Sequence, residues 1–130
     1  MAAPAIANSL NPVSHDYWRR TREIRVNSRL EDFSPVGAER EYKFQSLQSD
    51  LSRVAVAIQK NGGDARYVMG DQPSFADFAI AAVLMWANRM LNAEEWDKIM
   101  SFDSGRWKRF LEDMDEYATV DAGEAYKSKA

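Results

Sequence analysis

Apolar side chains recur every three or four residues along most of the chain, a spacing that predicts helices. The most regular series lies in a helix expected over about residues 36–61, and it would face a neighbouring helix. Its members are Phe44, Leu47, Leu51, Val54 and Ile58. The Asn-Gly-Gly sequence at 61–63 ends this helix, because glycine readily adopts the left-handed conformation that terminates helices. The pattern indicates no pair of β-strands.

Four further helices are expected. The first begins at Ser14, which can serve as its N-cap, and runs to about Phe33. Another begins after Ser74, and a short one follows Asn92, whose spacing from Glu95 suits a cap. The last follows the Phe-Asp-Ser-Gly sequence, which breaks the helical pattern before Trp107.

The two ends of the chain differ from the rest. Residues 1–13 and 118–130 are small, polar and irregular, and we interpret them as tails. The sequence therefore predicts one all-α domain, a five-helix bundle, over residues 14–117.

The helix after Ser74 is apolar on almost every side. Such a helix is expected at the centre of a bundle, where water cannot reach its first N–H groups. Ser74 and Asp77 have the spacing of a capping box, in which each side chain bonds to the backbone N–H of the other residue. We therefore predict a structural role for the Asp77 carboxylate rather than a catalytic one.

The composition of the chain excludes several classes of function. The net charge of −3 argues against a nucleic-acid binder, and the absence of cysteine excludes disulfides and thiolate chemistry. The longest apolar run, 78–87, is about half of the roughly 20 residues that cross a bilayer, and the amino terminus lacks the features of a signal peptide. We expect a soluble, cytoplasmic protein with no metal site, phosphate loop or nucleophile elbow.

Most large side chains of the later helices are expected in the core rather than in a cofactor site. They are Trp86, Trp96, Trp107, Met85, Met90, Met100 and Met114. The Tyr67-Val68-Met69 segment is expected to anchor the loop before Ser74. Trp18 is different, because it lies beside Tyr17 near the edge of the domain and could line a ligand cleft.

The only histidine, His15, stands beside Asp16 and Tyr17 at the start of the first helix. His15 and Tyr17 are therefore weak catalytic candidates, as a general acid or base. Adjacent residues on a helix point in different directions, so the alternative is an ordinary solvated helix start. We favour that alternative and leave the catalytic residues unknown.

Arginines of the first helix form a second candidate site, for binding of an anion. Arg22, Arg25 and Arg29 share a face and could bind an anionic ligand. The alternative, which we favour, is a solvated face paired with acids such as Glu23 and Asp32.

The stretch GDQPSFADFAIAA at 70–82 resembles the C-terminal helical domain of glutathione transferases, including the capping box of that family's central helix. Three further stretches are similar to a fungal branch that includes etherase-like transferases. They are LNPVSHDYWRRTRE at 10–23, EEWDKI at 94–99 and GRWKRFLE at 105–112. The resemblance covers about residues 10–115.

In that family a thioredoxin-like domain activates glutathione, and the 130 residues contain no counterpart of it. The resemblance therefore implies no cofactor, and glutathione only if such a domain is supplied separately. It also implies that the family's hydrophobic-substrate wall falls on the first helix. The residues at those positions are Tyr17, Trp18, Thr21, Arg22 and Arg25.

The function expected from this resemblance is binding of a hydrophobic small molecule. The chain would be either the acceptor-site half of a transferase or a stand-alone derivative that acts on a metabolite without glutathione activation. The alternative is a module for protein–protein interaction or dimerisation. A homodimer is therefore a possible assembly. We expect neither nucleic acid nor a membrane as a partner. Whether the chain is an enzyme is left open.

Overall fold

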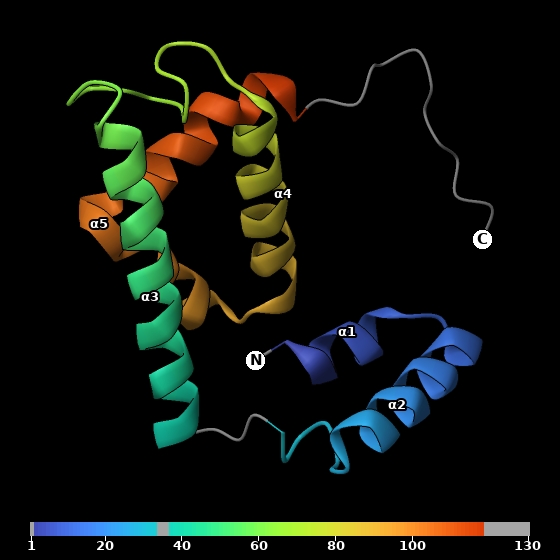
Figure 1. The fold of residues 1–130 in the computed structure, drawn as a ribbon. Helices are drawn as coiled ribbons and strands as arrows, with labels where there is room; N and C mark the ends of the chain where they lie inside the picture. The colour runs from blue at the N-terminus through green and yellow to red at the C-terminus, as the bar shows by residue number, and fades with distance from the viewer. Residues whose placement is uncertain (1, 34–36, 119–130) are drawn as a thin grey trace, which may run out of the picture.

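The computed structural model describes residues 2–33 and 37–118, and over these ranges it contains five α-helices and no β-strand (Figure 1). They are α1 (Ala3–Ser9), α2 (Pro12–Val26), α3 (Ala38–Gln59), α4 (Phe75–Met90) and α5 (Ala93–Met114), and a short 3₁₀ turn, η1 (Asp115–Tyr117), follows. The all-α class is confirmed. The helix boundaries differ from those expected at the amino-terminal end.

Residues 1–13, expected as a tail, instead include α1, which packs on α2 and buries Ala7 completely. Ser14 is not the N-cap of the first long helix. That position is Asn11, whose side chain accepts a hydrogen bond of 2.9 Å from the Ser14 N–H, and Pro12 follows it. At the other end of the chain, the expected tail from residue 119 onward lies outside the described residues.

Helix α2 ends at Val26 rather than near Phe33. Asn27 adopts a left-handed conformation with φ of 51°, and its N–H bonds back to the carbonyls of Glu23 and Ile24. Asparagine tolerates this conformation better than most residues, so it ends the helix about two turns earlier than expected. The α1–α2 pair lies beyond one end of the α3–α5 cluster (Figure 1). Lys43 of α3 joins the two parts by donating to the Phe33 carbonyl at 3.0 Å.

The core lies among α3, α4 and α5 (Figure 1). Its buried members include Phe44, Ala55, Tyr67, Ala81, Leu84, Ile99, Phe102, Trp107, Phe110 and Met114. The expected series on α3 is confirmed, because Phe44 and Ile58 are buried and Leu47, Leu51 and Val54 pack against the same core. Trp107 and Met114 are buried as expected, and Trp96 and Met100 pack against the core in part.

Helix α5 is interrupted where the sequence Phe-Asp-Ser-Gly predicted a break. Phe102 is extended, and Asp103, Ser104 and Gly105 are left-handed. The Asp103 carboxylate accepts hydrogen bonds from the Ser52 hydroxyl at 2.6 Å and from the Trp107 indole Nε1 at 2.8 Å. The bend is therefore fastened both to α3 and to the buried indole of the second half of α5. The expected cap of the first half also forms, because the Asn92 side chain accepts from the Glu95 N–H at 2.9 Å.

The capping box of α4 is confirmed. Asp77 is completely buried, and its Oδ2 accepts from the Ser74 N–H at 2.8 Å and from the Ser74 hydroxyl at 2.7 Å. Its Oδ1 accepts from the Val68 N–H at 2.8 Å. The carboxylate thus ties the preceding loop to the helix, a contact beyond the capping box itself. Tyr67 of that loop is buried as expected, whereas Met69 is exposed.

The expectation that α4 would be buried on every face is wrong. Asp77, Ala81 and Leu84 are buried against the rest of the bundle, whereas Phe75 is 88% exposed and Val83 63% exposed. Helix α4 packs on α5 along one side, and no other helix of the described ranges makes extensive contact with it. Trp86 and Met85, expected in the core, are for the same reason about half exposed.

An ion pair connects the start of α3 to the start of α5. Glu95 accepts from Arg40 through both carboxylate oxygens, with 2.9 Å between Nη2 and Oε2, and both side chains are largely buried. The hydrogen bond from Arg40 lowers the pKa of the Glu95 carboxyl below its ordinary value. Lys98 and Glu41 form a second link between the same two helices, at 2.7 Å, but both side chains are exposed.

Substitution Asp77→Ala leaves three partly buried donors, two amides and one hydroxyl, without this acceptor. We expect the free energy of unfolding to fall by about 2–4 kcal/mol, against about 1 kcal/mol for Ser74→Ala. Urea unfolding followed by far-ultraviolet circular dichroism measures both changes. Equal losses for the two variants would contradict the additional role of Asp77 in holding the loop.

The Arg40–Glu95 pair makes stability depend on pH. A carboxylate with a lowered pKa stabilises the fold above its unfolded pKa of about 4.3, and that stabilisation disappears as pH falls through the lowered folded pKa. We expect Glu95→Gln to lower the free energy of unfolding by about 1–2 kcal/mol at neutral pH and by much less at about pH 3.

The matched control is Glu41→Gln, which removes the exposed pair between the same helices and should cost less than about 0.5 kcal/mol. Urea unfolding at both pH values compares the two variants. A loss for Glu95→Gln that is the same at both pH values would contradict the assignment.

Candidate functional site

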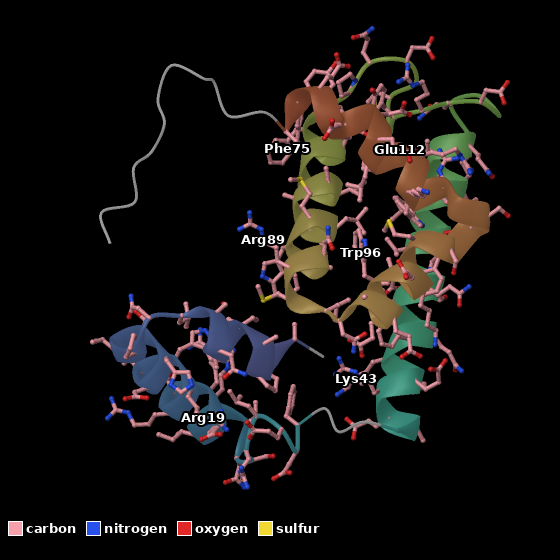
Figure 2. The ribbon with its side chains drawn as sticks, turned by 180° about the vertical axis from the view of Figure 1, so that it is seen from behind. Arg19, Lys43, Phe75, Arg89, Trp96 and Glu112 are labelled. Carbon is pink, nitrogen blue, oxygen red and sulfur yellow. The ribbon has the colours of Figure 1, made fainter. Side chains whose placement is uncertain are left out.

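The outer side of α4 is apolar and open to water. We call it the α4 surface, and its members are Phe75, Phe78, Val83, Met85 and Trp86. Figure 2 shows Phe75 on the side of the helix away from α3, with Arg89 on the same side near the other end. Monomeric proteins rarely expose a continuous apolar area of this kind without a function for it.

One edge of the α4 surface borders a groove of about 290 Å³, between α4 and the end of α5. Its lining residues are Phe78, Ala81, Ala82, Met85, Asn88, Leu111, Met114, Asp115, Tyr117 and Ala118. The rings of Phe78 and Tyr117 meet edge to face, 5.6 Å between centroids, and connect α4 to η1. An apolar hollow with few polar groups is typical of a small-molecule site, and this one is at the small end of the usual range.

The groove offers contacts rather than reactive groups. Its ionisable side chains are those of Asp115 and Tyr117. A hydrogen bond with Glu116 is the main reason that the pKa of the Tyr117 phenol is raised above its ordinary value. Tyr117 therefore stays protonated near neutral pH and is not an activated base. The arrangement suits binding of an apolar molecule through its surface.

The five residues predicted to form a ligand wall lie on α2 and do not line this groove. Tyr17 and Arg25 are exposed, and Trp18 and Thr21 are half-buried. The Thr21 hydroxyl lies 2.9 Å from the Tyr17 carbonyl and 3.0 Å from the Trp18 carbonyl, so its proton is donated to the helix backbone. The Arg22 guanidinium lies over the Trp18 ring, 5.3 Å from its centroid. The predicted wall and the groove are thus separate surfaces.

The weak catalytic candidates lie on the same helix. The His15 Nδ1 is 2.9 Å from the Asp16 carboxylate, so these two adjacent side chains do pair, although Asp16 is 87% exposed. Tyr17 is 62% exposed. Neither His15 nor Tyr17 lines the groove between α4 and the end of α5, and their catalytic role stays a prediction.

Acidic partners account for some of the α2 arginines. Arg19 pairs with Glu31 at 2.6 Å and with Glu23 at 3.1 Å, and Arg29 lies 3.7 Å from Glu31. Glu23 also accepts from the Leu30 N–H at 3.2 Å, which fastens the turn after α2 to the helix. Within the described ranges Arg22 and Arg25 have no ion pair within 4.0 Å, so the predicted acid-paired face is only partly formed.

Two other kinds of site can be assessed over residues 2–33 and 37–118. No three histidine, aspartate or glutamate side chains in this part of the chain are grouped so that they could hold a metal ion. No helix in the same part is both long enough and apolar enough to cross a bilayer.

Sequence reasoning assigned Met85 and Trp86 to the core and did not single out Phe78 or Tyr117. A signal was present, because the apolar positions of α4 cover more of its circumference than one packed face requires. That excess has two explanations, burial on all sides or an exposed apolar surface. The structure shows the second.

Comparisons with known proteins agree with this architecture. The sequence model of the family "Glutathione S-transferase, C-terminal domain" matches residues 1–117. The solved structure of glutathione transferase GSTFuA3 from Phanerochaete chrysosporium is 29% identical with a TM-score of 0.81, over 93% of this chain and 48% of that one.

A glutathione S-transferase of Ceriporiopsis subvermispora, solved in complex with glutathione, is 30% identical with a TM-score of 0.84, over 94% of this chain and 50% of that one. The chain thus spans about half the length of the solved structures that it matches. No curated protein matches the chain.

Proposed function

The chain belongs to the glutathione S-transferase C-terminal domain family, and from that premise we propose that it binds a hydrophobic small molecule in the groove between α4 and the end of α5. The groove is the observation that carries the proposal. Its walls are mainly alanine, methionine, leucine and aromatic side chains, and the polar groups of Asn88, Asp115 and Tyr117 among its lining residues could orient a ligand.

The proposal takes one of two forms. In the first, the chain is the acceptor-site half of a transferase, and the residue that activates glutathione belongs to a thioredoxin-like half. In the second, it is a stand-alone derivative that acts on a metabolite without glutathione activation. In both forms the described residues supply apolar contact area, and burial of that area drives binding at about 25 cal/mol per Å².

The α2 residues are a second location for the same function. Tyr17, Trp18 and the Arg22 guanidinium that lies over Trp18 form an aromatic and cationic surface, as the family resemblance implies for a substrate wall. The groove is the stronger candidate because it is concave, whereas Tyr17 projects into water. Variants on the two helices can separate the two locations.

Titration with the neutral, apolar dye Nile red tests the proposal. We expect saturable binding, and we expect Met85→Glu, which places a charge in the groove, to weaken it about tenfold because a desolvated charge is costly. Val83→Glu is the matched control, since it adds the same charge to the same helix outside the groove, and it should change the affinity less than about twofold.

Dye fluorescence and the emission of tryptophan measure binding. A loss of affinity in Tyr17→Ala but not in Met85→Glu would place the site on α2. Absence of saturable binding by the unsubstituted chain would contradict the proposal.

A second candidate function, protein–protein interaction, is favoured by the part of the α4 surface that the groove does not use. Phe75, Val83 and Trp86 are large, apolar and exposed, and none of them lines the groove. Covering them with another protein surface would remove apolar area from water. A second copy of the chain is the simplest partner.

Sedimentation velocity tests this alternative. We expect the unsubstituted chain to sediment as a dimer at micromolar concentration, and we expect Val83→Glu to shift it to the monomer because a charge would be buried at the contact. His15→Gln, a change on the solvated start of α2, is the control. A monomer at all concentrations for the unsubstituted chain would contradict dimerisation through the α4 surface.

A further inference from the structure

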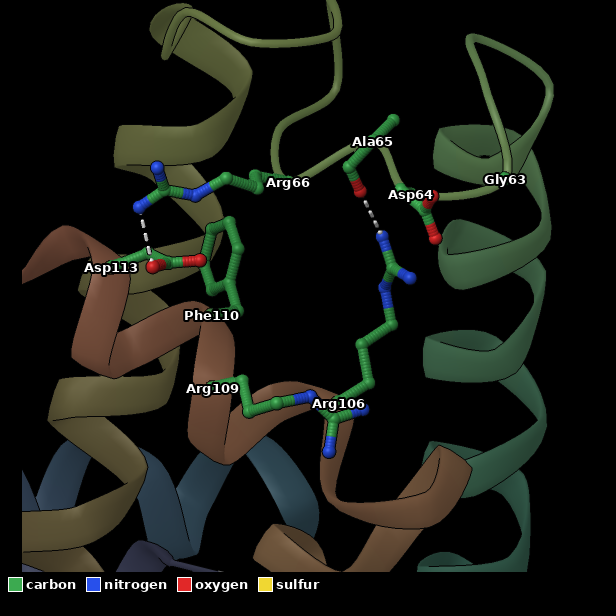
Figure 3. Close-up of a pocket in the computed structure, with 8 residues that line it drawn as sticks. All are labelled: Gly63, Asp64, Ala65, Arg66, Arg106, Arg109, Phe110 and Asp113. Carbon is green, nitrogen blue, oxygen red and sulfur yellow. Dashed lines mark hydrogen bonds and ion pairs between the residues drawn. The ribbon is translucent and has the colours of Figure 1, made fainter.

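A second pocket, of about 280 Å³, lies between the loop after α3 and the second half of α5 (Figure 3). Its lining residues are Gly63, Asp64, Ala65, Arg66, Arg106, Arg109, Phe110 and Asp113. It shares no residue with the apolar groove, and its chemistry is different, because three of its eight residues are arginines.

Two of these arginines, Arg106 and Arg109, donate to backbone carbonyls rather than to a carboxylate. Arg106 Nη2 donates to the Ala65 carbonyl at 2.9 Å, and Arg109 Nη1 donates to the Ser104 carbonyl at 2.9 Å. Both acceptors are neutral, and over residues 2–33 and 37–118 neither arginine has an ion pair within 4.0 Å.

Arg66 differs from both, since its Nη2 lies 2.5 Å from the Asp113 carboxylate. Arg66 and Asp113 thus pair with each other, and both line the pocket (Figure 3). The two arginines that donate to carbonyls, Arg106 and Arg109, are three residues apart on α5 and so lie on neighbouring parts of one helix face.

The carbonyl contacts hold these two guanidinium groups in place but occupy only part of their N–H donors. A guanidinium has five N–H donors in a planar fork, so donors are left over for a ligand. Figure 3 shows Arg106 extending along one side of the pocket toward Ala65, with Phe110 on the other side. Phe110 is 3% exposed and belongs to the hydrophobic core, so only a small apolar part of its ring lines the pocket.

We propose that this pocket binds a small organic anion, a carboxylate or a phosphate monoester attached to an apolar or aromatic body. The Arg106 and Arg109 forks recognise the anionic group, since guanidinium matches the oxygen spacing of carboxylates and phosphates. Phe110 packs against the body of the ligand. The site is separate from the groove, so it does not depend on the function proposed for that groove.

Asp64 sets a limit on the affinity. Its carboxylate lines the same pocket and is exposed, and it repels an incoming anion. Asp113 opposes binding less, because Arg66 already neutralises it. Removing the Asp64 charge should therefore strengthen binding, a result that a purely structural role of the arginines does not predict.

Nuclear magnetic resonance titration of the full chain with phenyl phosphate, benzoate and inorganic phosphate tests the proposal. We expect millimolar or tighter binding of phenyl phosphate and benzoate, and about fivefold weaker binding of inorganic phosphate, which has no body to pack on Phe110. Equal affinity for phenyl phosphate and inorganic phosphate would overturn the role of the apolar wall.

The decisive variant is Arg109→Gln, because this side chain is exposed and its hydrogen bond to the Ser104 carbonyl is local. We expect its affinity for phenyl phosphate to fall about tenfold with an unchanged unfolding midpoint. Asp64→Asn should raise the affinity about twofold to threefold. Arg25→Gln, a likewise exposed and unpaired arginine on α2, is the matched control and should leave the affinity unchanged.

Absence of saturable chemical-shift changes up to about 50 mM phenyl phosphate would overturn the proposal. A dissociation constant above that concentration would indicate no specific binding in this pocket. An equal loss in Arg25→Gln and Arg109→Gln would also overturn it, because that result indicates general charge attraction. An affinity of Asp64→Asn at or below that of the unsubstituted chain would contradict the electrostatic account of the pocket.

Discussion

The Asp77 carboxylate is the contact on which the rest of the helical bundle depends. It is completely buried and accepts from two backbone amides and one hydroxyl, so it satisfies both the start of α4 and the loop that leads into it. A buried carboxylate is tolerated only when such donors surround it. Because the loop carries buried Tyr67, the same contact also sets where the loop packs against α5, whose Asp113 carbonyl accepts from the Tyr67 hydroxyl at 3.3 Å.

Holding α4 in this way leaves its opposite side free. Helix α5 packs on one face of α4. The opposite face leaves five large apolar side chains exposed to water. Large apolar side chains left in water are typical of a surface that binds another molecule. The groove beside this face and the face itself explain why ligand binding and protein interaction are the two functions worth testing.

The groove beside α4 and the pocket beside the bend of α5 differ in chemistry for a structural reason. The groove is built from the apolar edge of α4 and from Leu111 and Met114 on the core-facing part of α5. The second pocket is built where the loop after α3 meets Arg106 and Arg109, beside the left-handed bend of α5. That bend is fastened by Asp103 to Ser52 and Trp107, so the arginines that follow it start from a fixed backbone. One helix thus supplies an apolar wall at its end and a cationic wall near its bend.

Features that depend on neighbours a few residues away were readable from the sequence. The series on α3, the capping box at Ser74, the N-cap at Asn92 and the break before Trp107 are of this kind, because helix periodicity and caps are local. The ends of the first long helix were predicted wrongly, at Ser14 and near Phe33, because the cap at Asn11 and the left-handed Asn27 were not singled out. Contacts between distant residues decided the rest: Arg40 meets Glu95 across 55 residues, and Arg106 reaches Ala65 across 41. Which side of α4 faces water, and which arginines share a pocket, follow from how whole helices are placed, and no local spacing encodes that placement.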